Sequence, residues 1–104
     1  MKGEGFLVPD WPAPPNVRAV VTTRASPGAS KPPFDRFNLG GRCGDDPAAV
    51  IANRESLIKA LALPEPPRWM RQVHGNEVYD ADAILADAEP TADASVTRIA
   101  GRVL

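Results

Sequence analysis

The clearest pattern of apolar and polar positions lies between Asp46 and Pro64. Apolar residues recur there at helical spacing, and Asp46 followed by Pro47 is typical of a capped helix start. Pro64 cannot continue the run. The pattern therefore predicts an amphipathic helix of about four turns. Its apolar positions are Val50, Ile51, Leu57, Ile58 and Leu61.

Shorter patterns before this helix predict strands. Residues 6–8 are apolar and end at Pro9, and residues 17–23 are rich in β-branched Val and Thr between turn-forming residues. We expect both segments to belong to one sheet. Residues 24–44 show no periodicity and predict a loop, which at this length inside a compact domain is usually functional.

A second alternation covers residues 69–79. Side chains from Trp69 to His74 alternate with a period of two, and Gly75 with Asn76 can form a two-residue turn into residues 77–79. This pattern predicts a β-hairpin with His74 at its tip. Residues 80–91 are Ala-rich and ambiguous, whereas residues 94–97 predict a strand and residues 101–104 resemble the start of another.

The composition favours one small globular domain and disfavours two classes of partner. The 104 residues are 43% hydrophobic and 24% charged, with a formal net charge of -1. Because the basic residues are spread along the chain, we expect no nucleic-acid partner. Because no apolar run reaches the length of a signal peptide core or a membrane span, we expect no membrane partner. The single cysteine fits a reducing compartment, which predicts a cytoplasmic protein.

The candidate chemistry converges on His74, the one histidine of the chain. An imidazole at the end of a short strand, next to a turn, can reach a metal or a substrate. Catalytic zinc needs about three protein ligands, and beyond His74 the chain offers only Cys43 and scattered carboxylates. The residues alone leave two roles open, a metal ligand and the commoner structural, hydrogen-bonding histidine.

Two further positions precede the predicted helix. Arg24, at the end of the strongest strand pattern, could bind phosphate or carboxylate through its forked guanidinium, or form a surface salt bridge. The glycine-rich residues 37–47 lead into a helix N-terminus, but Asp45 and Asp46 would repel an anion, so a capped helix is favoured over an anion site. For Cys43 a small buried apolar role is favoured over a nucleophile or a ligand.

Four segments together resemble the successive motifs of the YfiH-type family, also called the laccase-domain, polyphenol oxidase or purine nucleoside phosphorylase family. Their order and approximate spacing match from Phe6 to Leu104. The segments are Val-Thr-Thr-Arg at 21–24, Phe-Asn-Leu-Gly at 37–40 with Gly-Asp-Asp-Pro at 44–47, Trp-Met-Arg-Gln-Val-His-Gly at 69–75, and Ala-Asp-Ala-Ser-Val-Thr at 92–97.

The resemblance implies a fold and a domain organisation. We expect an α+β fold with mixed sheets and flanking helices, similar to the α/β/β/α layers of that family. Residues 1–104 would be the N-terminal portion of a single domain, roughly its first half, truncated at the C-terminus. The chain would then stop shortly before the family's second metal ligand.

The resemblance also implies a zinc site built from the histidine of Gln-Val-His-Gly, a cysteine of an Ala-Asp-Cys motif and a later histidine. His74 matches the first ligand, and the other two are expected after Leu104. Cys43 does not match the ligand cysteine. Arg42 stands where relatives carry a histidine before Gly-Asp.

The implied activity is phosphorolysis of adenosine, inosine or methylthioadenosine, together with adenosine deamination, so a purine nucleoside and phosphate are the expected partners. Arg24 and Asn38 would hold phosphate or ribose near the glycosidic carbon. Gln72 and Asp93 would either support the metal ligand from outside its coordination sphere or belong to the scaffold. The 104 residues alone should be inactive, because two of three ligands are missing. The alternatives are copper-dependent oxidation of phenols and a non-enzymatic remnant or interaction module.

Overall fold

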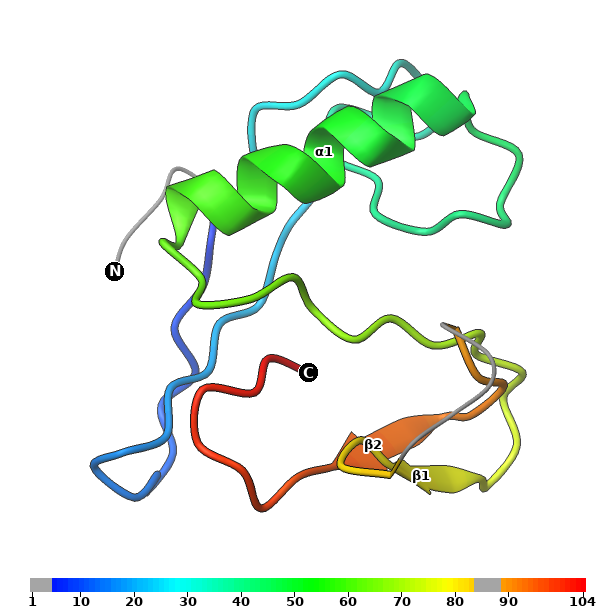
Figure 1. Ribbon diagram of the computed structural model, residues 1–104. Coiled ribbons are helices and arrows are strands. Elements are labelled where there is room, and N and C mark those ends of the chain that lie inside the picture. Colours follow the sequence, from blue (N-terminus) through cyan, green and yellow to red (C-terminus); the bar gives the residue numbers. More distant parts are fainter. Residues whose placement is uncertain (1–4, 84–88) are drawn as a thin grey trace. The chain divides into compact units, whose positions relative to one another are not determined.

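The computed structural model describes residues 5–83 and 89–104 (Figure 1). The chain divides into two compact units between Ala62 and Leu63. The elements are α1 (Pro47–Ala60) in the first unit, and β1 (Val78–Asp80) and β2 (Ala94–Val96) in the second. One helix and one two-stranded sheet place the described residues in the α+β class, while the layered arrangement stays a prediction. Within these ranges no helix has the length and apolar character to cross a membrane.

Helix α1 forms where the pattern predicts it. The Asp46 side chain accepts a hydrogen bond from the Ala48 N–H at 3.0 Å, and Pro47 occupies the first turn. Val50, Leu57 and the C-cap Leu61 are buried, as the spacing predicts. Ile51 is 58% exposed, because it lies off the buried stripe of the helix.

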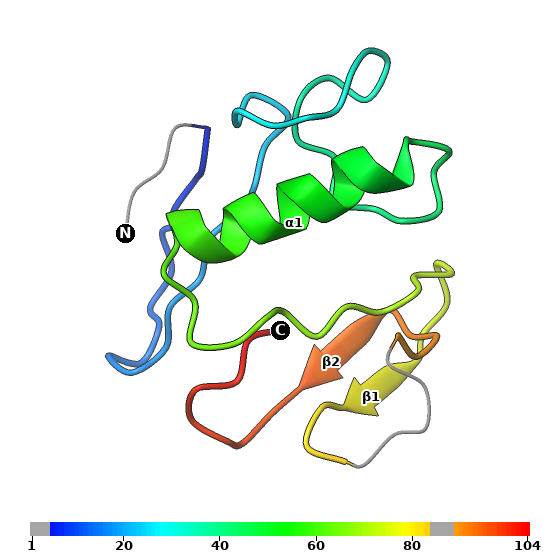
Figure 2. The same cartoon turned by 45° about the horizontal axis from the view of Figure 1, so that its top comes forward.

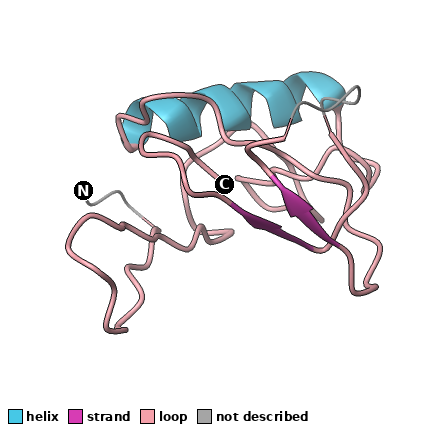
Figure 3. Cartoon of the chain, turned by 60° about the horizontal axis from the view of Figure 1, so that its bottom comes forward, coloured by secondary structure: helices cyan, strands magenta, loops and turns pink. Residues whose placement is uncertain are grey.

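The long loop before α1 is confirmed, since residues 24–44 contain neither helix nor strand. Figure 3 shows how much of the described chain is loop. Phe37 is the buried aromatic anchor of this loop and contacts Phe6, with ring centroids 5.8 Å apart. The first unit therefore builds its core from α1 and loop side chains together.

The two predicted N-terminal strands pair at one position only. Leu7 and Val21 form an isolated antiparallel bridge, with backbone N–H to O distances of 2.8 and 2.7 Å. Residues 6–8 and 17–23 are thus neighbours, but neither segment is a regular strand. Pro9 has no N–H with which to extend the pairing.

The predicted hairpin is wrong. β1 pairs with β2 in parallel, with Val78 opposite Ala94 and Asp80 opposite Val96 (Figure 2). Ahead of β1, Arg71 forms a parallel bridge to Thr91. Both halves of the supposed hairpin therefore lie along the same segment, 90–96, instead of along each other. The ambiguous residues 80–91 include 84–88, which lie outside the described residues.

The pairing leaves a bulge around His74. Seven positions separate Arg71 from Val78, whereas only three separate their partners, Thr91 and Ala94. Residues 72–77 therefore bulge out between the two paired positions. His74 stands in this bulge with a φ of 57°, in the left-handed region that side chains with a Cβ rarely adopt.

Candidate functional site

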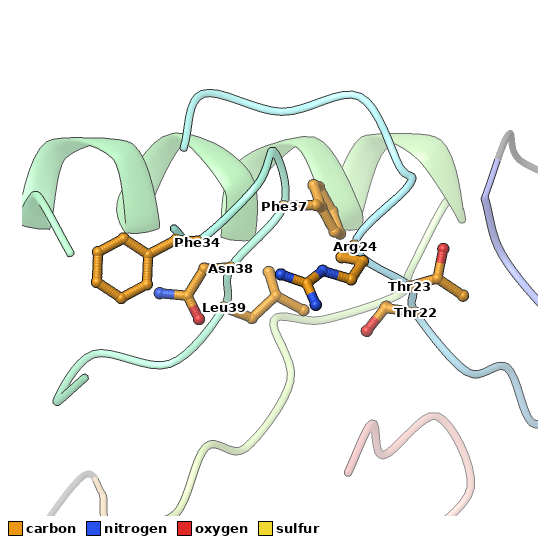
Figure 4. Close-up of a pocket in the computed structure, with 7 residues that line it drawn as sticks. All are labelled: Thr22, Thr23, Arg24, Phe34, Phe37, Asn38 and Leu39. Atoms are coloured by element: carbon orange, nitrogen blue, oxygen red, sulfur yellow. The ribbon is translucent and has the colours of Figure 1, made fainter. Parts of the chain in front are cut away.

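A pocket of about 300 Å³ brings the first two motifs together in the first unit (Figure 4). Residues of the Val-Thr-Thr-Arg motif form one side, and residues of the Phe-Asn-Leu-Gly motif form the other. The volume is at the lower end of the range for small-molecule sites. The lining residues are Thr22, Thr23, Arg24, Phe34, Phe37, Asn38 and Leu39.

Arg24, one of the two predicted catalytic residues, lies at this pocket with an exposed side chain. Its side chain is 72% exposed and forms an ion pair with Asp35, which is 40% exposed. A weak hydrogen bond also joins the Arg24 guanidinium to the Pro33 carbonyl at 3.5 Å. Because exposed ion pairs are worth little, an incoming anion can replace the Asp35 carboxylate.

Asn38, the second predicted residue, lines the same pocket, but its amide is used inside its own loop. The Nδ2 group donates to the Gly40 carbonyl at 3.1 Å, the Cys43 sulfur at 3.0 Å and the Asp45 carboxylate at 3.2 Å. The Oδ1 atom accepts from the Gly40 N–H at 3.1 Å. Asn38 therefore shapes the pocket wall.

A buried network behind Asn38 was missed by the sequence reasoning. Asn53 of α1 is fully buried, accepts from the Ala29 N–H at 2.7 Å, and donates to the Ser30 hydroxyl and the Asn38 carbonyl, both at 2.8 Å. Ser30 in turn donates to Asp45 at 2.7 Å. A signal was available in the sequence, since a polar residue stood on the predicted apolar face of the helix.

Asp45 completes this network as a charged acceptor. The hydrogen bond from Ser30 is the main reason that the pKa of Asp45 lies below its ordinary value of 3.8, with smaller contributions from Asn38 and the Asp46 N–H, against an opposing effect of burial. The carboxylate is thus ionised at neutral pH and faces the loop at the start of α1. This arrangement supports a capped helix in place of an anion site.

Cys43 differs from its prediction. Its side chain is exposed, not buried, with the sulfur within 3.4 Å of the Gly40 carbonyl. In the same loop Phe37 is buried and Leu39 is partly exposed at the pocket.

His74 belongs to the second unit, so the structure does not group it with Arg24 and Asn38. Its side chain is exposed at the bulge. In residues 5–83 and 89–104 no three His, Cys, Asp or Glu side chains gather closely enough to hold a metal ion. An exposed imidazole on a turn suits one ligand of a zinc site, but the described residues do not supply a complete set.

Asp93 lies directly under the bulge. One carboxylate oxygen accepts from the Val73 N–H at 3.1 Å, and the Asp93 N–H donates to the Glu77 carbonyl at 2.9 Å. Burial raises the pKa of Asp93, but the backbone N–H groups of Gly75, Val73, Glu77 and His74 lower it further, so the pKa lies below its ordinary value of 3.8. The carboxylate is therefore ionised inside the turn that carries His74.

One family model matches most of the chain. Residues 18–104 match the family described as multi-copper polyphenol oxidoreductase laccase. This range includes all four motifs.

Comparisons with individual proteins agree. A Xylella fastidiosa (strain 9a5c) protein named purine nucleoside phosphorylase is 52% identical over 94% of this chain and 40% of its own length. The purine nucleoside phosphorylase YfiH of Escherichia coli (strain K12) is 43% identical over 94% of this chain and 40% of its own length. The chain thus spans about 40% of the length of these curated relatives.

A solved structure shares the fold. The crystal structure of Neisseria meningitidis protein NMB0706 superposes with a TM-score of 0.76 at 40% identity, over 90% of this chain and 37% of that one. The sequence motifs, the family match and the superposition lead to one assignment. The chain belongs to the YfiH-type, laccase-domain family.

Proposed function

We propose that this chain is the N-terminal portion of a single-domain, zinc-dependent purine nucleoside phosphorylase that also deaminates adenosine. The observation that carries the proposal is the pocket that joins Thr22, Thr23 and Arg24 to the Phe-Asn-Leu-Gly loop, in a chain whose relatives are named purine nucleoside phosphorylases. The expected nucleosides are adenosine, inosine and methylthioadenosine. The cytoplasm is the expected compartment, because a single cysteine fits a reducing environment.

Phosphate is the part of the substrate pair that this pocket suits. A guanidinium binds a phosphate through two parallel hydrogen bonds. Among the residues that the structure describes, the partners of Arg24 are the exposed Asp35 carboxylate and the Pro33 carbonyl. Thr22 and Thr23 line the pocket as well. The residue type of Thr22 supplies a hydroxyl group for a polar ligand, whereas the Thr23 hydroxyl already donates to the Gly5 carbonyl and accepts from the Ala25 N–H at 3.3 Å. Arg24 would bind and orient phosphate, while Asn38 would keep the opposite wall in shape.

His74 would contribute one of three zinc ligands in the whole domain. The other two, a cysteine and a histidine, would come from sequence after Leu104. Bound there, zinc would supply a Lewis acid to the substrate. The 104 residues alone would then have no activity, because one imidazole does not hold the metal.

The proposal is tested by comparing two proteins. One is the 104-residue chain, and the other is the same chain continued at its C-terminus through the expected Ala-Asp-Cys and second-histidine motifs, called the continued chain below. With zinc, phosphate and inosine, the continued chain should release hypoxanthine in proportion to phosphate consumed, and with adenosine it should also form inosine. The short chain should do neither. Equal turnover by the short chain, or none by the zinc-loaded continued chain, would contradict the proposal.

The role of Arg24 gives a second prediction, made on the continued chain. Arg24→Gln should raise KM for phosphate by about 10-fold or more, because a charge-assisted hydrogen bond is lost. Asp35→Asn should lower KM for phosphate by about 2- to 5-fold, because the competing carboxylate is removed. Asp10→Asn, an exposed aspartate of the same unit, is the matched control and should leave KM unchanged. An unaltered KM for phosphate in Arg24→Gln would remove Arg24 from the site.

Copper-dependent phenol oxidation is the second candidate, favoured by the description of the matching family as a polyphenol oxidoreductase. Oxygen uptake by the copper-loaded continued chain with a phenol, without nucleoside turnover, would favour oxidation. Nucleoside turnover with zinc and no oxygen uptake would favour phosphorolysis.

A further inference from the structure

The bulge around His74 needs something to hold it in place. In the second unit the chain before the bulge pairs with Thr91 and the chain after it pairs with Ala94, so Asp93 lies between the two pairing points. A bulge of this size leaves its own backbone N–H groups without ladder partners. The Asp93 carboxylate lies next to these N–H groups and accepts a hydrogen bond from that of Val73.

The contacts of Asp93 match that need. Its Oδ1 atom accepts from the Val73 N–H at 3.1 Å, while its Oδ2 atom is buried without a hydrogen-bond partner among the described residues. The N–H groups of Gly75, Glu77 and His74 are near enough to lower the pKa of the carboxylate. On the other side, the Glu77 carbonyl accepts from the N–H groups of Asp93 at 2.9 Å and Ala94 at 3.2 Å. Val73, near the start of the bulge, and Glu77, at its end, are thus both hydrogen-bonded to Asp93.

Two backbone features show that the turn is closely fitted to this carboxylate. A Cβ added at Gly75 would lie 3.2 Å from the Asp93 Oδ2 atom, which leaves little room for a larger residue. His74 keeps a φ of 57°, and a non-glycine residue stays in that region only when its surroundings hold it there. The imidazole projects from this turn and is exposed.

We propose that Asp93 is the positioning residue for His74: its carboxylate closes the bulge of residues 72–77 and thereby fixes the direction in which the imidazole leaves the chain. Asp93 does not touch the substrate in this account. The inference rests on the proposed function in one respect, that the imidazole of His74 binds zinc. The positioning of His74 by Asp93 is a property of the chain without metal.

Asp82 offers a matched control in the same unit. It follows β1 and ties it to the chain after β2, where its carboxylate accepts from the Thr97 hydroxyl at 2.5 Å and the Arg98 N–H at 2.7 Å. Asp82 thus joins the carboxyl ends of the two strands, whereas Asp93 joins the chain at their amino ends. Asp82 also forms an ion pair with Arg102 at 3.5 Å, so its removal costs more hydrogen bonds and ion pairs than removal of Asp93, but only Asp93 touches the turn of His74.

The first measurement uses the 104-residue chain without metal. Nuclear magnetic resonance reports the left-handed backbone of His74 through a strong intraresidue amide-to-Hα Overhauser effect, and hydrogen exchange reports the amides of Val73 and Gly75. Asp93→Ala should remove the Overhauser signature and speed exchange of both amides at least about tenfold. Asp82→Ala should leave both readouts as in the parent. Gly75→Ala, which crowds Asp93 without removing it, should shift both readouts in the direction of Asp93→Ala.

The second measurement is the zinc affinity of the continued chain, by competition with a coloured chelator. Asp93→Ala should weaken zinc binding by about 10- to 100-fold, as expected for a residue that orients a ligand, and Asp82→Ala by less than about threefold. Asp93→Asn, which keeps the shape and one acceptor, should fall between Asp93→Ala and the parent.

The outcomes separate the two hypotheses. An unchanged His74 backbone in Asp93→Ala, or an equal loss of zinc affinity in Asp82→Ala, overturns the positioning role. If the parent continued chain binds no zinc while Asp93→Ala still releases the turn, the proposed function fails and the positioning of His74 stands.

Discussion

Replacing His74 in the continued chain is expected to abolish tight zinc binding and to lower phosphorolysis by at least about 100-fold, because loss of residues that only orient a ligand already costs 10- to 100-fold. His74→Asn is the informative variant. Asparagine tolerates the left-handed backbone found at this position and so keeps the turn intact, but its amide is a poor zinc ligand. Zinc content after dialysis and the rate of hypoxanthine release measure the effect.

Stability provides the control for this prediction. Since the His74 side chain is exposed, His74→Asn should change the free energy of unfolding by less than about 0.5 kcal/mol. His74→Ala should be somewhat less stable, because alanine tolerates a φ of 57° poorly. Retention of stoichiometric zinc and full activity in His74→Asn would show that this imidazole is not a ligand.

Replacing Asn53 is expected to have the largest effect on stability. Asn53→Ala would remove the partner of the part-buried Ala29 N–H and Asn38 carbonyl and of the buried Ser30 hydroxyl, at about 1–3 kcal/mol for each group left buried and unpaired. A decrease of about 3 kcal/mol or more in the free energy of unfolding follows. Chemical denaturation of the 104-residue chain, followed by circular dichroism of α1, measures this change.

A control on the same helix isolates the cause. Ile51 is 58% exposed, and Ile51→Ala should change stability by less than about 0.5 kcal/mol. Asn53→Leu should not rescue the loss, because leucine fills the space without a hydrogen bond. The leucine side chain would also lie against Gly28, because the Asn53 Oδ1 atom is so close to Gly28 that a Cβ added to that glycine would lie 2.5 Å from it. Equal stability of Asn53→Ala and Ile51→Ala would refute the role of the network.

The helix and the loop could be predicted because their signals are local. Asp46, Pro47 and Pro64 delimit α1 in the sequence, and helical spacing identifies the buried positions. The position of Arg24 and Asn38 at one pocket was anticipated only through the family motifs, since no local pattern shows that residues 21–24 and 37–40 are neighbours.

The region of His74 could not be predicted from alternation. The period of two from Trp69 to His74 describes an extended chain, but it does not say which segment lies beside it. The true partner, residues 90–96, is distant in sequence, and the bulge arises from the unequal spacing of two bridges. That register brings the Asp93 carboxylate to the Val73 N–H, a contact that no local pattern in the sequence indicates.

Zinc-edge anomalous diffraction from the zinc-loaded continued chain is the most direct test of the central claim. We expect one zinc ion bonded to a ring nitrogen of His74 at about 2.0–2.1 Å, with a cysteine and a second histidine from beyond Leu104. A zinc ion bound elsewhere, with the His74 imidazole outside its coordination sphere, would contradict the account.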